Sequence, residues 1–335
     1  ISSLKSAIMK NITRSIDIKM TTGWSYMLAL LVLTAVGCSE DFLERKPKGQ
    51  LTYDTFFETP DHAVWATNAV YQQYRSWEMC AFPWIGITDI ISDDADKGST
   101  PNDALYVLEL DEFTFDGTNA AITGAWLGHY QAIFRANLAI ENIPGIDMDS
   151  TLRARLIGEC RFLRAYAYFR LVQWYGDVPL ITTILNDDQY YNQERTSKEL
   201  VYDFIETDLL AAIEALPEKD EYASADLGRA TKGAARGILA KLYAVQHDFP
   251  KVIEQCDAII NSGEYSMLAR YADNFLPVGE HGDESIFEIS AVASQAAIVG
   301  PGATPFNMIQ GVRGVPNLGW GFNRPSDDLV AEYEA

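Results

Sequence analysis

The sequence contains few cysteines, few histidines and few basic residues. Its 335 residues include four cysteines and four histidines, and 26 Lys and Arg stand against 47 Asp and Glu, a formal net charge of −21. The cysteines lack C-x-x-C spacing, so neither a zinc site nor a redox pair is indicated. The excess of acids argues against nucleic acid and anionic lipid headgroups as partners, and it favours a neutral or cationic ligand.

Motifs of the common enzyme classes are missing. The sequence contains no H-E-x-x-H, no G-x-S-x-G and no G-x-G-x-x-G. The segment from Gly228 to Gly233 lacks the Lys-Ser/Thr that ends a phosphate loop, and the histidines are too dispersed to suggest a metal site. No acid pair stands out as a glycosidase pair. We therefore expect a binding protein without a cofactor, and keep a carbohydrate-cleaving enzyme as a weaker alternative.

The N-terminal region has the features of a targeting segment. The apolar run Met27–Val36 follows a basic stretch and, at ten residues, is shorter than the roughly 20 that span a bilayer. Small residues then precede Cys38, the order typical of a lipoprotein signal peptide. We predict a signal peptide over residues 1–37, acylation of Cys38, a lipid-anchored tether over 38–58 and an α-helical domain over 59–335. An ordinary signal peptide with an incidental cysteine is the alternative.

The strongest helical pattern lies in Leu152–Trp174. Apolar residues recur there at spacings of three and four, and Phe162, Tyr166 and Phe169 form a second apolar ridge. Ser150 or Thr151 is expected to cap its start, and Gly176 to end it. A helix that is apolar on two sides is expected to lie between other helices, with its arginines solvated or paired with acids of neighbouring helices.

The remaining pattern predicts a mainly α fold, with tetratricopeptide-like helical hairpins as the scaffold, loop-rich irregular segments and a few short strands. Extended segments are expected at Val178–Thr183 and Glu284–Ile289, and a polar loop at Asn186–Glu194. Further helices are expected at Pro60–Trp77, Ile122–Ile143, Ser197–Leu216, Lys232–Gln246 and Pro250–Asn261.

Two segments without periodicity, Glu78–Ala120 and Val299–Arg324, hold aromatic residues among Gly and Pro. Long irregular segments of this kind are often functional. Aromatic rings can cover the apolar C–H faces of a sugar, and polar side chains can bind its hydroxyls. The candidate ligand-binding residues are Trp77, Phe82, Trp84, Trp320, Asn323 and Arg324.

The alternative for Trp84 and Trp320 is packing in the core, which we also expect of Trp65, Trp126 and Trp174. The acids of the Asp89–Asp96 segment resemble half a calcium loop, but the remaining ligand spacing is missing. We therefore predict no metal, and leave a calcium ion there as an open alternative. Cys160 and Cys256 are expected to be buried thiols.

Three segments together resemble the SusD/RagB family of outer-membrane nutrient-binding lipoproteins of Gram-negative bacteria. They are RFLRAYAYFRLVQWYGDVPLIT, which begins at Arg161, the helix pair in Arg229–Leu268, and the leader that ends at Cys38 and continues SEDFLERKP. The resemblance implies a protein anchored in the outer membrane and facing the exterior. It implies a glycan ligand and a SusC-like TonB-dependent transporter as partner. It also implies that further sequence follows Ala335.

A helical-repeat scaffold that binds a protein or peptide is the second hypothesis. It needs the same helical hairpins, and the acidic surface would attract a basic segment.

Overall fold

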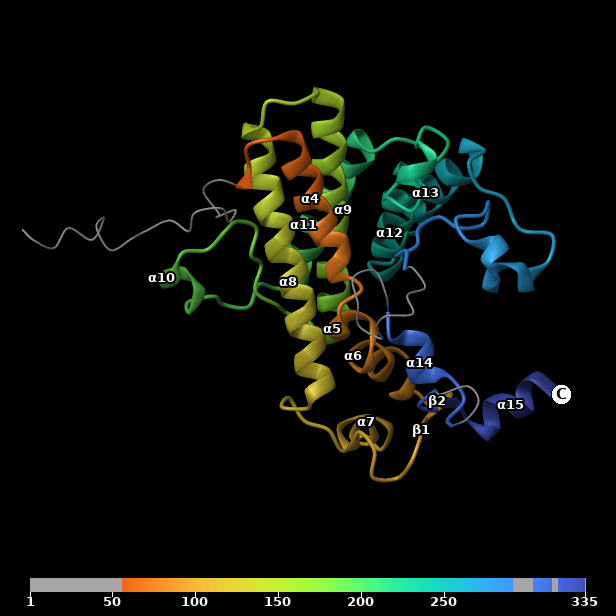
Figure 1. The fold of residues 1–335 in the computed structure, drawn as a ribbon. Coiled ribbons are helices and arrows are strands. Elements are labelled where there is room, and N and C mark those ends of the chain that lie inside the picture. The colour runs from red at the N-terminus through yellow and green to blue at the C-terminus, as the bar shows by residue number, and fades with distance from the viewer. Residues whose placement is uncertain (1–55, 292–303, 315–318, 335) are drawn as a thin grey trace, which may run out of the picture. The chain divides into compact units, whose positions relative to one another are not determined.

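Six long helices pack side by side, each against its neighbours along the chain (Figure 1). The computed structural model describes residues 56–291, 304–314 and 319–334. Helix α4 packs against both α8 and α9; α9 packs against α11, α11 against α12, and α12 against α13. Their bounds are α4 (Pro60–Gln73), α8 (Ala120–Asn142), α9 (Ser150–Tyr175), α11 (Lys198–Ala215), α12 (Lys232–Val245) and α13 (Phe249–Ser262). The mainly α fold predicted from the sequence is confirmed.

Helix α9 lies at the centre of this array, as its two apolar ridges predict. Leu156, Leu163 and Leu171 are fully buried on one ridge, and Phe162 and Phe169 are buried on the other. Gly176 ends the helix at a φ of 67°, a conformation that favours glycine. The expected N-cap is wrong by one or two residues.

The cap of α9 is Asp149, whose side chain accepts a hydrogen bond from the backbone N–H of Leu152 at 2.8 Å. The helix therefore begins early enough for Ser150 and Thr151 to lie inside its first turn.

A buried polar network joins three of the helices. The guanidinium of Arg164 on α9 donates to Asp208 of α11 at 2.8 and 2.9 Å, and to Asn137 of α8 at 2.6 Å. It also donates to the carbonyl of Thr182, which holds the segment after α9 against the helices. Arg164 thus pairs with an acid of a neighbouring helix, as expected for the arginines of α9.

The long helices end close to where periodicity places them, with one exception. Four of the predicted helices agree with α8, α11, α12 and α13 to within two residues at each end. Helix α4, however, ends at Gln73, before the expected Trp77. Tyr74 remains buried and donates to the carbonyl of Leu163, but the extended backbone of Ser76 then starts a new short helix.

The segment Glu78–Ala120, expected to be irregular, consists largely of short elements. They are α5 (Trp77–Cys80), α6 (Phe82–Ile85), the π-helix η1 (Gly86–Ile90), β1 (Ala95–Gly98) and α7 (Leu105–Asp111). Elements of four to seven residues are too short to show a helical period in sequence. Strand β1 pairs antiparallel with β2 (Phe322–Pro325), so that Ala95 faces Pro325 and Gly98 faces Phe322.

The two predicted extended segments do not form strands. Val178 makes a single bridge to Thr196, and Glu284–Ile289 is irregular. In the second segment Phe287 packs its ring on Phe162 at 4.8 Å between centroids, so the alternating pattern reflects packing on a helix. The shorter elements are α10 (Asp187–Tyr190), α14 (Phe306–Gln310), α15 (Asp327–Glu334), η2 (Ile143–Gly145), η3 (Ser224–Asp226), η4 (Tyr271–Phe275) and η5 (Pro277–Gly279).

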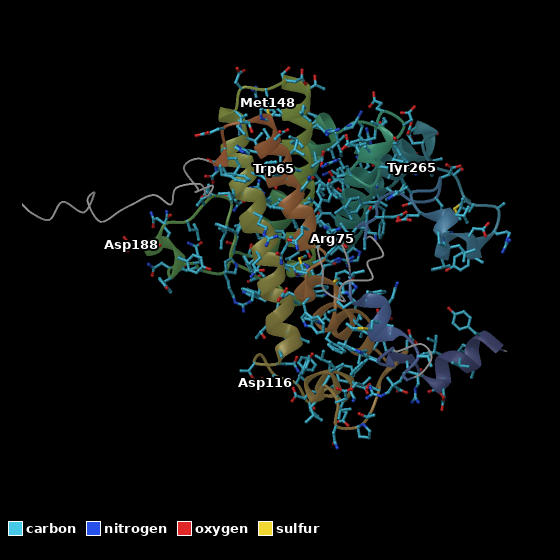
Figure 2. All side chains as sticks on the ribbon, viewed as in Figure 1. Trp65, Arg75, Asp116, Met148, Asp188 and Tyr265 are labelled. Carbon is cyan, nitrogen blue, oxygen red and sulfur yellow. The ribbon has the colours of Figure 1, made fainter. Side chains whose placement is uncertain are left out.

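Two burial predictions are wrong. Trp65 on α4 (Figure 2) is 51% exposed, because its side chain lies on the face of α4 away from α8 and α9. Cys256 on α13 is half-buried, whereas Cys160 is fully buried as expected.

The predicted signal peptide and Cys38 lie outside the described residues. Within the part of the chain that the structure describes, no helix combines the length and the apolar character needed to cross a membrane.

Candidate functional site

Short elements from two distant parts of the chain form a second, aromatic core. We call this the aromatic lobe and define it as residues 77–113, 304–314 and 319–326. Its centre is a buried cluster formed by Ala81, Phe82, Ile85, Ile90, Val107, Ile309 and Phe322. Partly buried side chains pack around this cluster, among them Trp77, Trp84, Tyr106 and Trp320. The two segments predicted to supply ligand-binding aromatics therefore meet in one place.

Two glycines allow the segments to meet at the end of the β1–β2 ribbon. Gly98 and Gly321 have φ angles of 70° and 73°, and a Cβ on Gly98 would clash with the carbonyl of Gly321. Ser99 instead donates its backbone N–H to that carbonyl at 2.6 Å. Trp320, which precedes Gly321 in the chain, donates its backbone N–H to the carbonyl of Met308 at 2.8 Å. This hydrogen bond fixes the backbone of Trp320 beside α14.

A hollow of about 450 Å³ opens beside these rings, a volume in the range of small-molecule sites. The rings of Phe82 and Trp320 lie 6.0 Å apart between centroids with an interplanar angle of 23°, and Trp77 lies 6.3 Å from Trp320. The hollow is lined by Phe82, Asp103, Arg313, Gly314, Gly319, Trp320 and Phe322. It therefore has an aromatic wall and a charged wall.

The charged wall is an ion pair between Asp103 and Arg313. The guanidinium of Arg313 lies 3.1 Å from the Asp103 carboxylate, and it also donates to the hydroxyl of Ser99 and to the carbonyl of Trp320. The Ser99 hydroxyl donates to Asp103 at 2.8 Å. This hydrogen bond, with a smaller contribution from Arg313, holds the pKa of Asp103 below its usual range, so the carboxylate is charged at neutral pH.

Buried Lys97 supports the loop that carries Asp103. Its ammonium donates to the carbonyls of Thr100 and Asp103 at 2.8 and 2.9 Å, and it lies 5.6 Å from the centroid of the Phe322 ring. Lys97 is thus occupied in holding the backbone of this loop, and it does not line the hollow.

The six candidate residues lie in three places: at the hollow, against α9 and beside the β1–β2 ribbon. Phe82 and Trp320 line the hollow, and Trp77 packs against both rings without lining it. Trp84 instead faces α9, with its ring 5.8 Å from Trp174 and 5.2 Å from the guanidinium of Arg170.

The two polar candidates lie beside the ribbon. Asn323 donates its amide to Asp89 at 2.9 Å and to Gln310 at 2.7 Å, and Arg324 pairs with Asp96 across the ribbon at 2.8 Å. Asn323 and Arg324 hold the ribbon and do not line the hollow.

These contacts also bear on the acidic segment that resembles half a calcium loop. Two of its carboxylates are engaged by Asn323 and Arg324. Among residues 56–291, 304–314 and 319–334, no group of three or more His, Cys, Asp and Glu side chains is placed to hold a metal ion.

Comparison with known proteins decides the family. Residues 41–244 match the model of the SusD-like family described as "Starch-binding associating with outer membrane". The chain belongs to the SusD-like family. The match covers more than half of the chain, including α4, α8, α9, α11 and most of α12.

Individual relatives agree with this assignment. A SusD-like protein of Formosa agariphila is 26% identical over 77% of this chain and 50% of its own length. Among solved structures, a laminarin-binding SusD-like protein superposes with a TM-score of 0.72 at 24% identity, over 83% of this chain and 64% of its own. Surface glycan-binding protein A from Bacteroides thetaiotaomicron, in complex with laminarihexaose, gives 0.70 at 24% identity over 82% and 61%. The chain spans about half the length of the curated relatives that it matches.

Apart from two glycines, sequence reasoning missed three of the residues that line this hollow. Phe322 follows Trp320 by two positions, and Arg313 lies among the glycines of the same segment, so both were within the region already suspected. A charged residue in a stretch rich in glycine and apolar residues was the available signal for Arg313. No signal marked Asp103, because its role depends on a contact with a residue 210 positions away.

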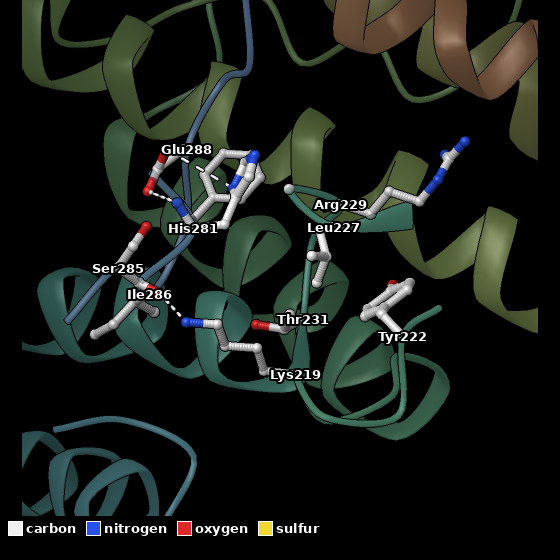
Figure 3. Close-up of a pocket in the computed structure, with 11 residues that line it drawn as sticks. Lys219, Tyr222, Leu227, Arg229, Thr231, His281, Ser285, Ile286 and Glu288 are labelled. Atoms are coloured by element: carbon white, nitrogen blue, oxygen red, sulfur yellow. Dashed lines mark hydrogen bonds and ion pairs between the residues drawn. The ribbon is translucent and has the colours of Figure 1, made fainter. Parts of the chain in front are cut away.

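A second hollow, shown in Figure 3, is much smaller and is closed by its own contacts. At about 20 Å³ it has room for roughly one water molecule. Lys219 donates to the carbonyls of Gly282 and Ser285, and the backbone N–H of His281 donates to the carboxylate of Glu288. These polar groups tie the loop before α12 to the segment that follows η5, and they leave no room for a sugar.

Proposed function

We propose that this SusD-like chain is a non-catalytic glycan-binding protein and that the hollow of the aromatic lobe is its sugar site. The observation that carries the proposal is the nearly parallel pair of rings, Phe82 and Trp320, beside the Asp103–Arg313 pair. Rings can cover the C–H face of a sugar, while the carboxylate accepts and the guanidinium donates hydrogen bonds to its hydroxyls.

Family membership supports a carbohydrate ligand. The family description names starch binding, and two solved relatives of the same fold are a laminarin-binding protein and a complex with laminarihexaose. Phe322, which also lines the hollow, and Trp77, which lies behind it, both pack on the ring of Phe82, so the aromatic wall is held in place before a ligand arrives.

A pair of tryptophan variants tests the site. A glycan is first identified on an array, and its affinity for Trp320→Ala is then measured by calorimetry. We expect at least a severalfold loss of affinity with little change in melting temperature, because Trp320 is half-buried at the edge of the lobe.

The matched control is Trp84→Ala, which removes a ring that packs on Trp174 and Arg170. We expect a lower melting temperature and a retained affinity. Unchanged affinity in Trp320→Ala would contradict the proposed site. A loss of affinity confined to Trp84→Ala would indicate that the ligand binds closer to α9.

We further propose that the chain is lipid-anchored at Cys38 and covers a SusC-like TonB-dependent transporter. The family description, which includes association with the outer membrane, supports this location. The helical array offers a surface for a protein partner, since Phe249, Ile253 and Ile260 are 58%, 60% and 70% exposed along one face of α13.

Co-purification from outer membranes solubilised in mild detergent tests the partnership. The protein should bring down a large β-barrel, and changing Ile253 and Ile260 to Ser should weaken this association while the glycan affinity stays the same. A reproducibly monomeric preparation would count against the transporter.

A further inference from the structure

Basic side chains are few in the aromatic lobe, and each one is engaged by neighbouring groups. Its described residues contain nine Asp and Glu but only three Lys and Arg. Arg313 pairs with Asp103, Arg324 pairs with Asp96, and the ammonium of Lys97 is buried on two backbone carbonyls. Arg313 is the described cation that lines the hollow, and its charge is already paired with Asp103 when a ligand enters.

Within the hollow, Asp103 and Arg313 are the two charged lining residues. Their side chains are 41% and 48% exposed, so both can touch a ligand. The carboxylate is fixed by three neighbours: the Ser99 hydroxyl, the Arg313 guanidinium and the backbone of its own loop, which Lys97 holds. Its charge thus lies beside Arg313 before a ligand enters the hollow.

We propose that Asp103 is a specificity residue that makes the hollow select neutral glycans over glycans carrying carboxylate or sulfate groups. The inference rests on the proposed function of the hollow as the sugar site. An acidic sugar placed against Arg313 would have to displace Asp103 or approach its charge, and like charges a few ångströms apart repel each other. Neutral hydroxyls avoid this cost and can bond to both members of the pair, so discrimination arises from repulsion of the wrong ligand.

The test compares probes of equal length at one ionic strength. Laminarihexaose and other neutral hexasaccharides serve as neutral probes, and hexagalacturonate and sulfated hexasaccharides serve as acidic probes. The wild type is expected to bind at least one neutral probe and none of the acidic probes measurably. Asp103→Asn preserves the size of the side chain and leaves the charge of Arg313 unpaired. It should raise affinity for acidic probes by about tenfold or more, with a gain that weakens at high salt.

Two further variants isolate the cause. Adding Arg313→Gln to Asp103→Asn should abolish the gain, because the uncompensated cation is removed. Asp116→Asn makes the same change of charge on the loop between α7 and α8 (Figure 2). The carboxylate of Asp116 accepts hydrogen bonds from the backbone and hydroxyl of Thr118, and this variant should leave all affinities unchanged. If Asp103→Asn lowers the melting temperature strongly, Asp103→Ser replaces it.

The outcomes separate the inference from the proposed function. Wild-type binding to acidic probes as tight as to neutral ones would overturn the role of Asp103, and so would the absence of a gain in both Asp103 variants. If Trp320→Ala leaves the affinity for the bound glycan unchanged, the sugar site lies elsewhere, and the inference falls together with the proposed function.

Discussion

At the scale of single residues, His129 on α8 shows what burial does to a titratable group. It is 1% exposed, its Nδ1 lies 2.7 Å from the carbonyl of Ala125, and its Nε2 has no partner in the described part of the chain. Burial lowers the pKa of the imidazole from 6.5 to about 4, so the ring is neutral in the folded protein at neutral pH.

This shift predicts an acid-sensitive component of stability. The unfolded chain takes up a proton near pH 6.5, whereas the folded chain does so only near pH 4. The free energy of unfolding should therefore fall as the pH is lowered through this window, by up to about 3 kcal/mol.

Urea titrations at several pH values measure the slope of the free energy of unfolding against pH. His129→Gln should flatten it between pH 7 and 5.5, above the range in which ordinary carboxylates titrate. An equal slope in the variant would show that His129 is not its source.

Core packing of α9 gives a second prediction at this scale. Leu163 is fully buried, and Leu163→Ala should lower the free energy of unfolding by about 2–5 kcal/mol. Leu127 on α8 is 51% exposed, and Leu127→Ala should cost less than about 0.5 kcal/mol. Similar losses in the two variants would contradict the central position of α9.

At the scale of elements, length decided what the sequence could reveal. The long helices show several turns of periodicity and were placed to within two residues at most ends, whereas α5, α6 and η1 have too few residues for any period to emerge. The predicted strand at Glu284–Ile289 failed because alternation also arises where an irregular segment packs one ring, Phe287, on a helix.

The attachment of the short helices to α8 depends on two glycines. Added Cβ atoms on Gly124 and Gly128 would lie 2.9 Å from Pro83 and 2.7 Å from Glu78, so α5 and α6 approach α8 closely only because these side chains are missing. Gly128→Val should displace α5 and with it Trp77. We expect a loss of stability of about 1–3 kcal/mol and weaker glycan binding.

Gly117→Val is the control, because nothing lies within 4 Å of a Cβ at that position. Thermal melts and glycan titrations of the two variants would show whether α8 positions the site. Unchanged binding in Gly128→Val would mean that α5 contributes little to it.

At the scale of the whole molecule, the sequence indicated the two segments that meet in the aromatic lobe but not the charged wall of its hollow. Phe82 and Trp320 were candidates because they are aromatic residues among Gly and Pro, and both line the hollow. The opposite wall depends on a contact between Asp103 and Arg313 across most of the chain, and no local pattern reveals such a contact.

Anchoring is a separate prediction for the whole protein. Cys38→Ser should abolish acylation and release the protein from the membrane fraction, while glycan affinity of the released protein is preserved. Mass spectrometry and fractionation check this result. A wild type without acyl mass, together with a variant that stays on the membrane, would contradict the prediction of a lipid anchor.

The β1–β2 ribbon has a consequence for the order of folding. It pairs Gly98 with Phe322, 224 residues further along, whereas the long helices mostly pack on near neighbours in sequence. Contacts that close long loops carry a larger entropic cost and form late. The lobe should therefore assemble after the helical array and open before it. In native-state hydrogen exchange, the amides of Ser99 and Trp320 should exchange sooner than those in the middle of α9, and bound glycan should slow the first group alone.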